Sequence, residues 1–179
     1  LFDAETAAAV AEFFGARPEI RLAVDPVLAS TSGSRLLDDG AAEVLKNSLI
    51  PLAEVITPNL DEGAALLGLG KIENAADAAR ALYEKYGVPV LLKGGHLSGD
   101  AVTDILFDGS GPFEMSSPRI SGIDTHGSGC TLSAAIAANF AKGLGLREAC
   151  RAARAYLVSG MSAPLRIGGG NFINHFPQK

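Results

Sequence analysis

The spacing of apolar residues along the chain predicts alternating helices and short buried strands. Apolar residues recur with helical spacing over residues 6–14, 41–49, 60–67, 75–86 and 146–161. Short runs that are apolar on both faces predict strands over residues 20–24, 53–56 and 88–92. Such strands, alternating with helices, indicate an α/β fold with a mainly parallel sheet and helices on both faces.

Two further patterns complete the predicted fold. Residues 101–107 and 113–117 flank the turn sequence Asp108-Gly109-Ser110-Gly111, which predicts a β-hairpin and therefore an antiparallel edge. An alanine-rich stretch from Leu132 to Lys142 carries an apolar stripe and predicts another helix. No repeat or linker divides the chain, so we expect one domain over residues 1–179.

Composition narrows the classes of function. The chain has 179 residues, of which 47% are hydrophobic and only 20% charged, which favours a globular fold over disorder. A net charge of −5 gives no broad basic surface for nucleic acid or anionic lipid, so we expect small-molecule ligands. Cys130 and Cys150 form neither a disulfide framework nor a metal-ligand pattern, which favours a reducing, cytoplasmic setting.

A glycine-rich turn before the alanine-rich helix is the main candidate for chemistry. Its sequence is Asp124-Thr125-His126-Gly127-Ser128-Gly129-Cys130-Thr131. Unpaired amides and the positive end of the helix dipole can hold a phosphoryl group there, and the same field favours a thiolate at Cys130. Alternatively, the glycines only form a turn and the cysteine packs as a small apolar residue.

Polar residues at the predicted strand ends offer a cation site. Asp25 follows a strand directly, and Asn59 and Glu62 share one face at the start of a helix, which suits Mg2+ and its waters. The structural alternatives are a turn cap for Asp25, an N-cap for Asn59 and a capping-box partner for Glu62.

Lys93 and His126 are two further candidates for the phosphate site. Lys93 ends the predicted strand over residues 88–92, where its ammonium could neutralise phosphate charge; a solvated lysine is the alternative. His126 could orient the glycine turn by hydrogen bonding.

The spacing of Gly63 and Gly68 suggests a Walker phosphate loop. However, Leu69 stands where that motif needs lysine, so we assign these glycines to helix packing and termination.

Four motifs along the chain are Asp25-Pro26-Val27, Thr57-Pro58-Asn59-Leu60-Asp61-Glu62, Lys93-Gly94-Gly95-His96 and the glycine turn with Leu132-Ser133-Ala134-Ala135. Together they resemble the hydroxymethylpyrimidine and phosphomethylpyrimidine kinases of thiamin synthesis, which belong to the ribokinase-like superfamily. The resemblance follows the family's order and spacing from near Leu22 to the Asn174-His175-Phe176 tail. A cysteine at position 130, where the superfamily's sugar kinases have aspartate, favours a pyrimidine or pyridoxal substrate.

The resemblance implies ATP-dependent phosphorylation of 4-amino-5-hydroxymethyl-2-methylpyrimidine and then of its monophosphate at one site. It implies that Gly127, Ser128 and Gly129 form an anion hole, with Thr125 beside them at the nucleotide. By the same resemblance Cys130 accepts or guides the hydroxyl proton.

The resemblance also implies roles for the residues at the strand ends. Asn59 and Glu62 would organise Mg2+ and the triphosphate, Lys93 would contact phosphate, and Asp25 would support the metal region. The family is commonly dimeric, so a homodimer is expected.

The chain departs from the family at its start, since no glycine-rich opening segment precedes Leu1. We therefore expect a ribokinase-like domain that is incomplete at the N-terminus and has little kinase activity alone. Pyridoxal kinase and a truncated, non-catalytic kinase module are the alternative functions.

Overall fold

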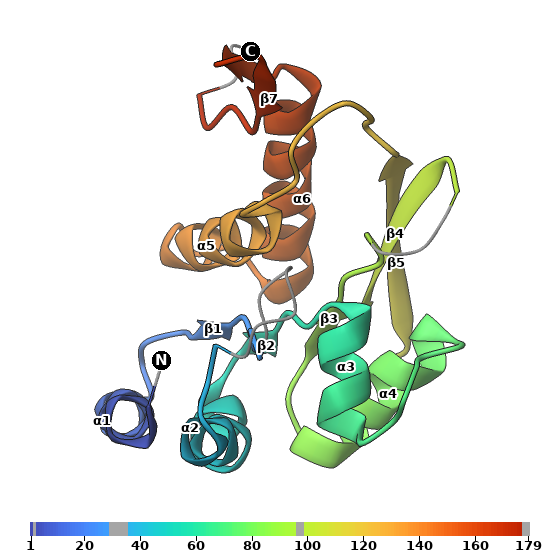
Figure 1. Ribbon diagram of the computed structural model, residues 1–179. Helices are drawn as coiled ribbons and strands as arrows, with labels where there is room; N and C mark the ends of the chain where they lie inside the picture. The colour runs from blue at the N-terminus through green and yellow to red at the C-terminus, as the bar shows by residue number, and fades with distance from the viewer. Residues whose placement is uncertain (2, 29–35, 96–98, 177–179) are drawn as a thin grey trace.

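A five-stranded sheet runs through the middle of the molecule in the order β1-β2-β3-β4-β5 (Figure 1). The computed structural model describes residues 1, 3–28, 36–95 and 99–176. The strands of this sheet are β1 (Ala23–Val24), β2 (Val55–Ile56), β3 (Val90–Leu92), β4 (Ala101–Phe107) and β5 (Pro112–Pro118). Strands β1, β2 and β3 pair in parallel, whereas β4 pairs antiparallel with both β3 and β5. The predicted parallel sheet with an antiparallel hairpin at one edge is confirmed.

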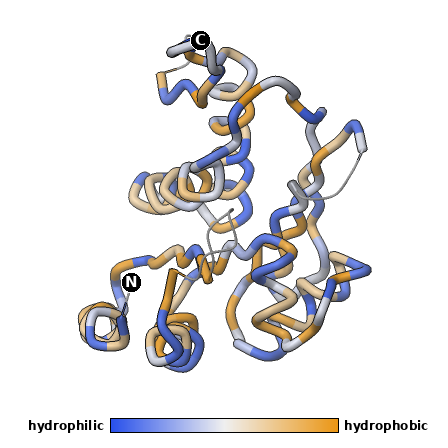
Figure 2. Tube along the Cα trace, viewed as in Figure 1, coloured by the Kyte–Doolittle hydropathy of each residue, from blue (hydrophilic) through white to orange (hydrophobic). Residues whose placement is uncertain are grey.

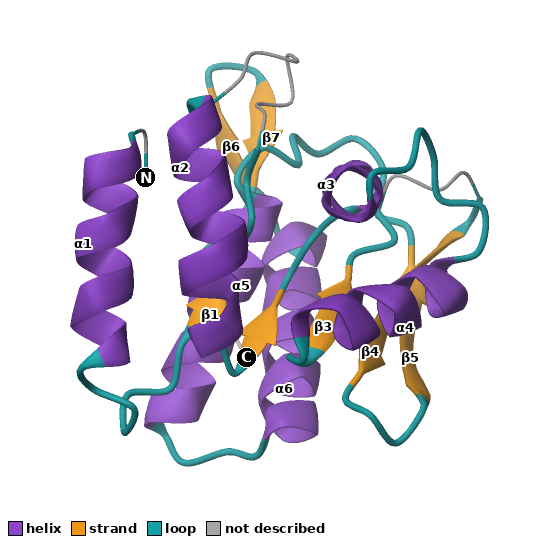
Figure 3. Cartoon of the chain, turned by 90° about the horizontal axis from the view of Figure 1, so that it is seen from below, coloured by secondary structure: helices purple, strands orange, loops and turns teal. Residues whose placement is uncertain are grey.

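Helices cover both faces of this sheet, as predicted. They are α1 (Ala4–Gly15), α2 (Asp39–Val44), α3 (Leu60–Leu67), α4 (Ala75–Tyr86), α5 (Ser128–Ala141) and α6 (Leu146–Ser162). Helices α1 to α4 lie on one face and α5 and α6 on the other (Figures 1 and 3).

The strands bury side chains on both faces because successive residues of a strand point in opposite directions. In β3, Val90 and Leu92 belong to the core under α1 to α4, and Leu91 belongs to the core under α5 and α6. All three are at most 1% exposed, and the central strands appear as hydrophobic segments in Figure 2. The sheet thus separates two cores.

Local signals explain the helix boundaries. Asp3 caps α1 through a hydrogen bond from the Thr6 N–H to its carboxylate (2.8 Å). Gly68 ends α3 in the left-handed conformation, with φ 74°, and a β-carbon at Gly63 would lie 3.0 Å from Ile72 and Leu92 side chains. These two glycines terminate and pack a helix, as predicted.

Three local predictions need correction. The strand predicted over 20–24 is regular only at Ala23–Val24, because the Ile20 N–H is used in a turn, where it donates to the Arg17 carbonyl (3.0 Å). The strand predicted over 53–56 is likewise limited to Val55–Ile56. The helix predicted over 41–49 is helical throughout, but it changes from α-helix to π-helix at Leu45–Leu49 and continues as a 3-10 helix at Ile50–Leu52. This change of type buries Leu45, Leu49 and Ile50.

The glycine-rich tail forms an unpredicted hairpin of β6 (Leu165–Ile167) and β7 (Gly170–Phe172). Gly168 and Gly169 both have positive φ at its turn, which a glycine adopts at little cost. Within the described ranges, no helix combines the length and hydropathy needed to cross a bilayer.

Candidate functional site

The glycine turn leads directly into α5 and leaves amide groups free at its N-terminus. Gly127 is the N-cap in the left-handed conformation, with φ 79°, and no side chain caps the helix. The Thr131 N–H bonds back to the Gly127 carbonyl (2.9 Å), whereas the Gly129 and Cys130 amides come too early in the helix for an intrahelical acceptor. Free donors and the helix dipole thus make this end suitable for an anion.

The turn before α5 is held by its own polar groups and by the tail hairpin. The Ser128 N–H donates to the Thr125 carbonyl (3.1 Å), and the His126 N–H donates to Asp124 Oδ1 (2.8 Å). Asn171 in β7 accepts from the Asp124 N–H through its carbonyl (2.8 Å) and donates from Nδ2 to the Gly122 carbonyl (2.8 Å). Sequence reasoning missed this support from Asn171, because the contact exists only once the tail folds back.

Asp25, Glu62 and Lys93 form a charged cluster at the carboxyl ends of the parallel strands. The Lys93 ammonium lies 2.7 Å from Asp25 Oδ1 and 3.8 Å from Glu62 Oε2, with all three side chains at most 14% exposed. The hydroxyl of the buried Thr57 also donates to Asp25 Oδ1 (3.0 Å). The structure therefore unites the three charged residues that the sequence placed at separate strand ends.

Asn59 and Glu62 form a capping box at the start of α3. The Glu62 N–H donates to Asn59 Oδ1 (2.8 Å) and the Asn59 N–H donates to Glu62 Oε2 (2.7 Å). This confirms the structural alternative for both residues, whereas Asp25 binds Lys93 and Thr57 instead of capping a turn. Burial raises the pKa of Glu62, and the nearby Lys93 ammonium opposes that rise.

The cluster and the start of α5 meet at Gly129. A β-carbon on this glycine would lie 3.1 Å from Lys93 Nζ and 3.4 Å from Asp25 Oδ2. The first turn of α5 thus lies directly against the charged cluster, with no side chain of its own between them.

The Cys130 side chain is exposed. It lines a shallow hollow together with Thr131, Ala134 and Ala135 of α5, Tyr156 of α6 and His175 of the tail. Cys150, by contrast, is fully buried, and burial raises the pKa of its thiol to about 12.

The oxygen ligands in the charged cluster are of the type that binds a hard cation, but they are few. Asp25 and Glu62 supply carboxylate oxygens, the ligand type that Mg2+ prefers. Within the described part of the chain, no group of three or more histidine, cysteine, aspartate or glutamate residues comes together as a metal cage. Few protein ligands are typical of a magnesium ion that is held mainly by waters and substrate phosphates. His96, at the end of the third motif, lies outside the described residues.

The chain has the ribokinase-like fold, which it shares with kinases of known structure. Pyridoxal kinase from Staphylococcus aureus, solved with AMP-PCP and pyridoxal, superposes with a TM-score of 0.83 at 30% identity over 96% of this chain and 63% of that chain. Phosphomethylpyrimidine kinase from Clostridium difficile gives 0.73 at 32% identity, over 88% of this chain and 64% of that one.

The chain belongs to the phosphomethylpyrimidine kinase family, whose sequence model matches residues 1–175. A hydroxymethylpyrimidine/phosphomethylpyrimidine kinase from Rhizobium meliloti is 45% identical over 96% of this chain and 66% of its own length. A thiamine biosynthesis bifunctional protein from Geobacter sulfurreducens is 42% identical over 98% of this chain and 36% of its own length. The chain thus spans about two thirds or less of these relatives.

Proposed function

We propose that the protein containing this chain transfers the γ-phosphoryl group of ATP to the hydroxymethyl group of 4-amino-5-hydroxymethyl-2-methylpyrimidine, and then a second phosphoryl group to the resulting monophosphate. The uncapped start of α5, with Gly129 against Lys93, carries this proposal. Family membership and the names of the curated relatives support the substrate.

The chain's own groups divide the work of one transfer. The amides of Gly127, Gly129 and Cys130, with Thr125 beside them, hold oxygens of the transferred group, and the Lys93 ammonium neutralises part of its charge. The Ser128 amide, which the resemblance also implied for the anion hole, donates to the Thr125 carbonyl instead (3.1 Å). The substrate hydroxyl oxygen bonds to the γ-phosphorus as the bond from that phosphorus to the β–γ bridging oxygen breaks, which releases ADP. Cys130 accepts or guides the hydroxyl proton.

We assign the metal region to Asp25 and Glu62, with Asn59 oriented by its capping box beside them. Mg2+ bound there would neutralise charge on the triphosphate. Asp25 and Glu62 also fix the Lys93 ammonium, so the same carboxylates can serve both cations.

Pyridoxal phosphorylation is the second candidate, because the pyridoxal kinase of Staphylococcus aureus matches at a TM-score of 0.83. The curated relatives at 45% and 42% identity favour the pyrimidine. Competition between the two substrates for one enzyme preparation decides between them. A non-catalytic module is disfavoured because Cys130, Lys93, Asn59 and Glu62 are all retained.

A homodimer in the cytoplasm is the proposed setting. The commonly dimeric state of the family supports the dimer. The free thiols Cys130 and Cys150 suit a reducing compartment.

The test is Cys130→Ala in the enzyme that contains this chain. We expect turnover to fall by about 10²-fold or more, the usual contribution of a positioned proton acceptor, with nucleotide affinity mostly kept. Cys150→Ala is the matched control: it removes the buried thiol, so it should lower stability by about 1 kcal/mol and leave turnover unchanged. Full turnover in Cys130→Ala would remove this cysteine from the reaction.

A further inference from the structure

A buried ion pair lies behind the Lys93 end of β3, outside the residues assigned above. Asp104 in β4 is 5% exposed and Arg154 in α6 is 8% exposed. Arg154 Nη1 donates to Asp104 Oδ2, while Nη2 donates to the Val102 carbonyl (2.5 Å) and to Ser117 Oγ (3.0 Å). The pair thus ties α6 to the β4–β5 hairpin.

The second oxygen of Asp104 holds the backbone next to Lys93. Asp104 Oδ1 accepts from the Gly94 N–H at 2.8 Å. A β-carbon on Gly94 would lie 1.8 Å from the Thr103 carbonyl oxygen, so this backbone lies directly against β4. On the opposite side, the Lys93 N–H donates to the Pro58 carbonyl at 2.8 Å. The backbone at Lys93 and Gly94 is therefore held on one side by the segment after β2 and on the other side by β4.

We propose that Asp104 is a positioning residue for Lys93, and that Arg154 holds the Asp104 carboxylate in the orientation this requires. The proposal rests on the proposed function, in which the Lys93 ammonium contacts the transferred phosphate. With the backbone fixed by Asp104 and the ammonium by Asp25, the lysine keeps one place beside Gly129. Phosphoryl transfer depends mainly on positioning and charge, so a displaced ammonium lowers turnover.

Charge explains why the acceptor for Gly94 needs the arginine. Burial raises the pKa of Asp104, and the Arg154 guanidinium opposes that rise. The guanidinium thus favours the ionised carboxylate, which is a stronger acceptor for the Gly94 N–H than a neutral carboxyl group. Arg154 thus acts on Lys93 through Asp104.

The experiment compares two double variants of the enzyme that contains this chain, Asp104→Asn/Arg154→Met and Asp104→Leu/Arg154→Met. Both remove the ion pair and keep similar side-chain size, but only asparagine offers the Gly94 N–H an acceptor. We expect kcat of the leucine variant to be lower by about tenfold or more, since a misplacement of about 1 Å can cost about 10²-fold. Turnover is measured below both melting temperatures, so that loss of folded enzyme does not contribute.

A second measurement reports on the phosphate contact alone. The affinity for AMP-PCP should fall in the leucine variant relative to the asparagine variant, whereas the affinity for adenosine should not. Lys93→Met sets the scale for complete loss of the ammonium. If the two double variants had the same kcat and the same ratio of AMP-PCP affinity to adenosine affinity, the ion pair would be only structural.

Two further outcomes distinguish a failure of the positioning role of Asp104 from a failure of the proposed function and from misfolding of a variant. If the unaltered enzyme phosphorylates neither pyrimidine nor pyridoxal, the proposed function fails, while the AMP-PCP comparison still decides the role of Asp104. If Asp104→Leu prevents folding, Asp104→Asn alone is compared with Asp104→Asn/Arg154→Met. With Arg154 present, the asparagine carbonyl turns toward the guanidinium and its NH2 toward Gly94, so the single variant should have the lower kcat; equal values would overturn the proposal.

Discussion

Gly129 is the residue on which the candidate site depends most directly. It stands in the first turn of α5, where any larger residue would place its β-carbon 3.1 Å from the Lys93 ammonium. The absence of a side chain lets the helix N-terminus approach the charged cluster. Sequence reasoning predicted a phosphate-binding turn here, but it could not predict which of the glycines faces the lysine.

We therefore predict that Gly129→Ala separates activity from stability. Alanine favours a helix over glycine by about 1 kcal/mol, so the melting temperature should hold or rise. Turnover should fall by about tenfold or more, because the methyl group displaces Lys93 or the phosphate. Gly15→Ala in α1 is the control, since its β-carbon would meet only Leu52 at 3.8 Å. Unchanged turnover in Gly129→Ala would contradict the close approach.

At the scale of elements, α3 joins a helix cap to the proposed metal region. The same Glu62 oxygen that accepts from the Asn59 N–H lies 3.8 Å from the Lys93 ammonium. A capping box satisfies two amides of the helix, so Asn59 and Glu62 would be favoured here even without a ligand. Their roles in the cap and at the nucleotide must be separated by substitution.

Glu62→Gln makes this separation, because its amide oxygen can still accept from the Asn59 N–H. The folded state holds the pKa of Glu62 above its ordinary value of 4.5, so ionisation destabilises the fold as the pH rises above about 4.5. The melting temperature of Glu62→Gln relative to the unaltered protein should therefore increase from about pH 4 to about pH 7. We also expect a higher Mg2+ requirement for turnover.

Glu62→Ala serves as the comparison for this measurement. It removes both the charge and the cap, and loss of a cap costs about 1 kcal/mol. If Glu62→Gln is as unstable as Glu62→Ala and its Mg2+ requirement is unchanged, the carboxylate serves only the helix.

The contact between α6 and the β4–β5 turn predicts an acid-sensitive element. Arg147 Nε donates to Asp108 Oδ2 at 2.7 Å and Nη2 to Oδ1 at 3.0 Å. These hydrogen bonds hold the pKa of Asp108 well below its ordinary value of 3.8, so the stabilisation is present above that pH and is lost as the pH falls below it. The difference in melting temperature between the unaltered protein and Asp108→Asn should shrink as the pH falls from about 5 to about 3. In an Arg147→Met background, this pH-dependent difference should disappear.

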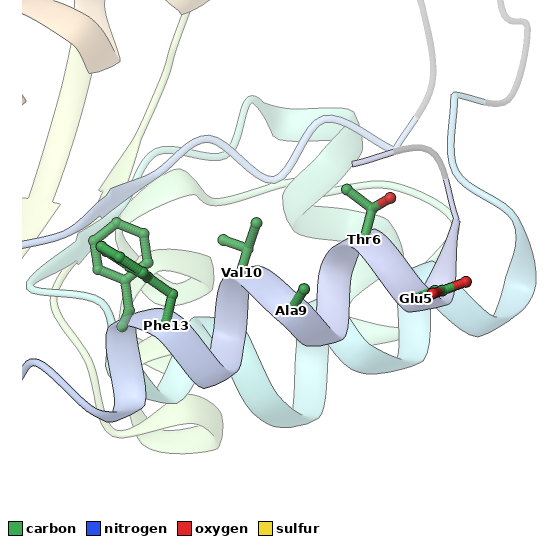
Figure 4. Close-up of a pocket in the computed structure, with 6 residues that line it drawn as sticks. Glu5, Thr6, Ala9, Val10 and Phe13 are labelled. Atoms are coloured by element: carbon green, nitrogen blue, oxygen red, sulfur yellow. The ribbon is translucent and has the colours of Figure 1, made fainter.

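At the scale of the whole molecule, α1 presents an apolar surface beside the β1 edge of the sheet (Figures 1 and 4). Its side chains line a hollow formed by Glu5, Thr6, Ala9, Val10, Phe13 and Phe14. Phe13 is 46% exposed. We predict that this surface, next to an edge strand of the sheet, promotes self-association of the chain.

Phe13→Gln should reduce the concentration-dependent association of the 179-residue chain, measured by sedimentation velocity. The cost in stability should be about 1 kcal/mol or less, since the ring is half exposed and mainly contacts Phe14 and Arg17. Phe176→Gln is the control, because Phe176 is 88% exposed and lies outside the α1 surface. If both substitutions reduced association equally, the α1 surface would not be the site of self-association.

Local signals in the amino-acid sequence predict most of the helices and strands and identify the candidate residues. The helices over Leu60–Leu67 and Ala75–Tyr86 and the strand Ala101–Phe107 begin and end where periodicity and glycine signals place them. Local propensity, capping and turn chemistry act over a few residues, so a reader of the sequence can see them.

The contacts between these residues, in contrast, arise from the packing of the whole fold. The contact of Gly129 with Lys93 and Asp25, the Asp104–Arg154 pair and the support of the glycine turn by Asn171 all join segments far apart in the chain. Such contacts depend on how the strands are ordered and how the two helix layers pack on them. The local pattern of apolar and polar residues does not contain this information. Each of these contacts joins two segments that are far apart in the chain, and the residues next to one partner do not determine which residue the other partner is.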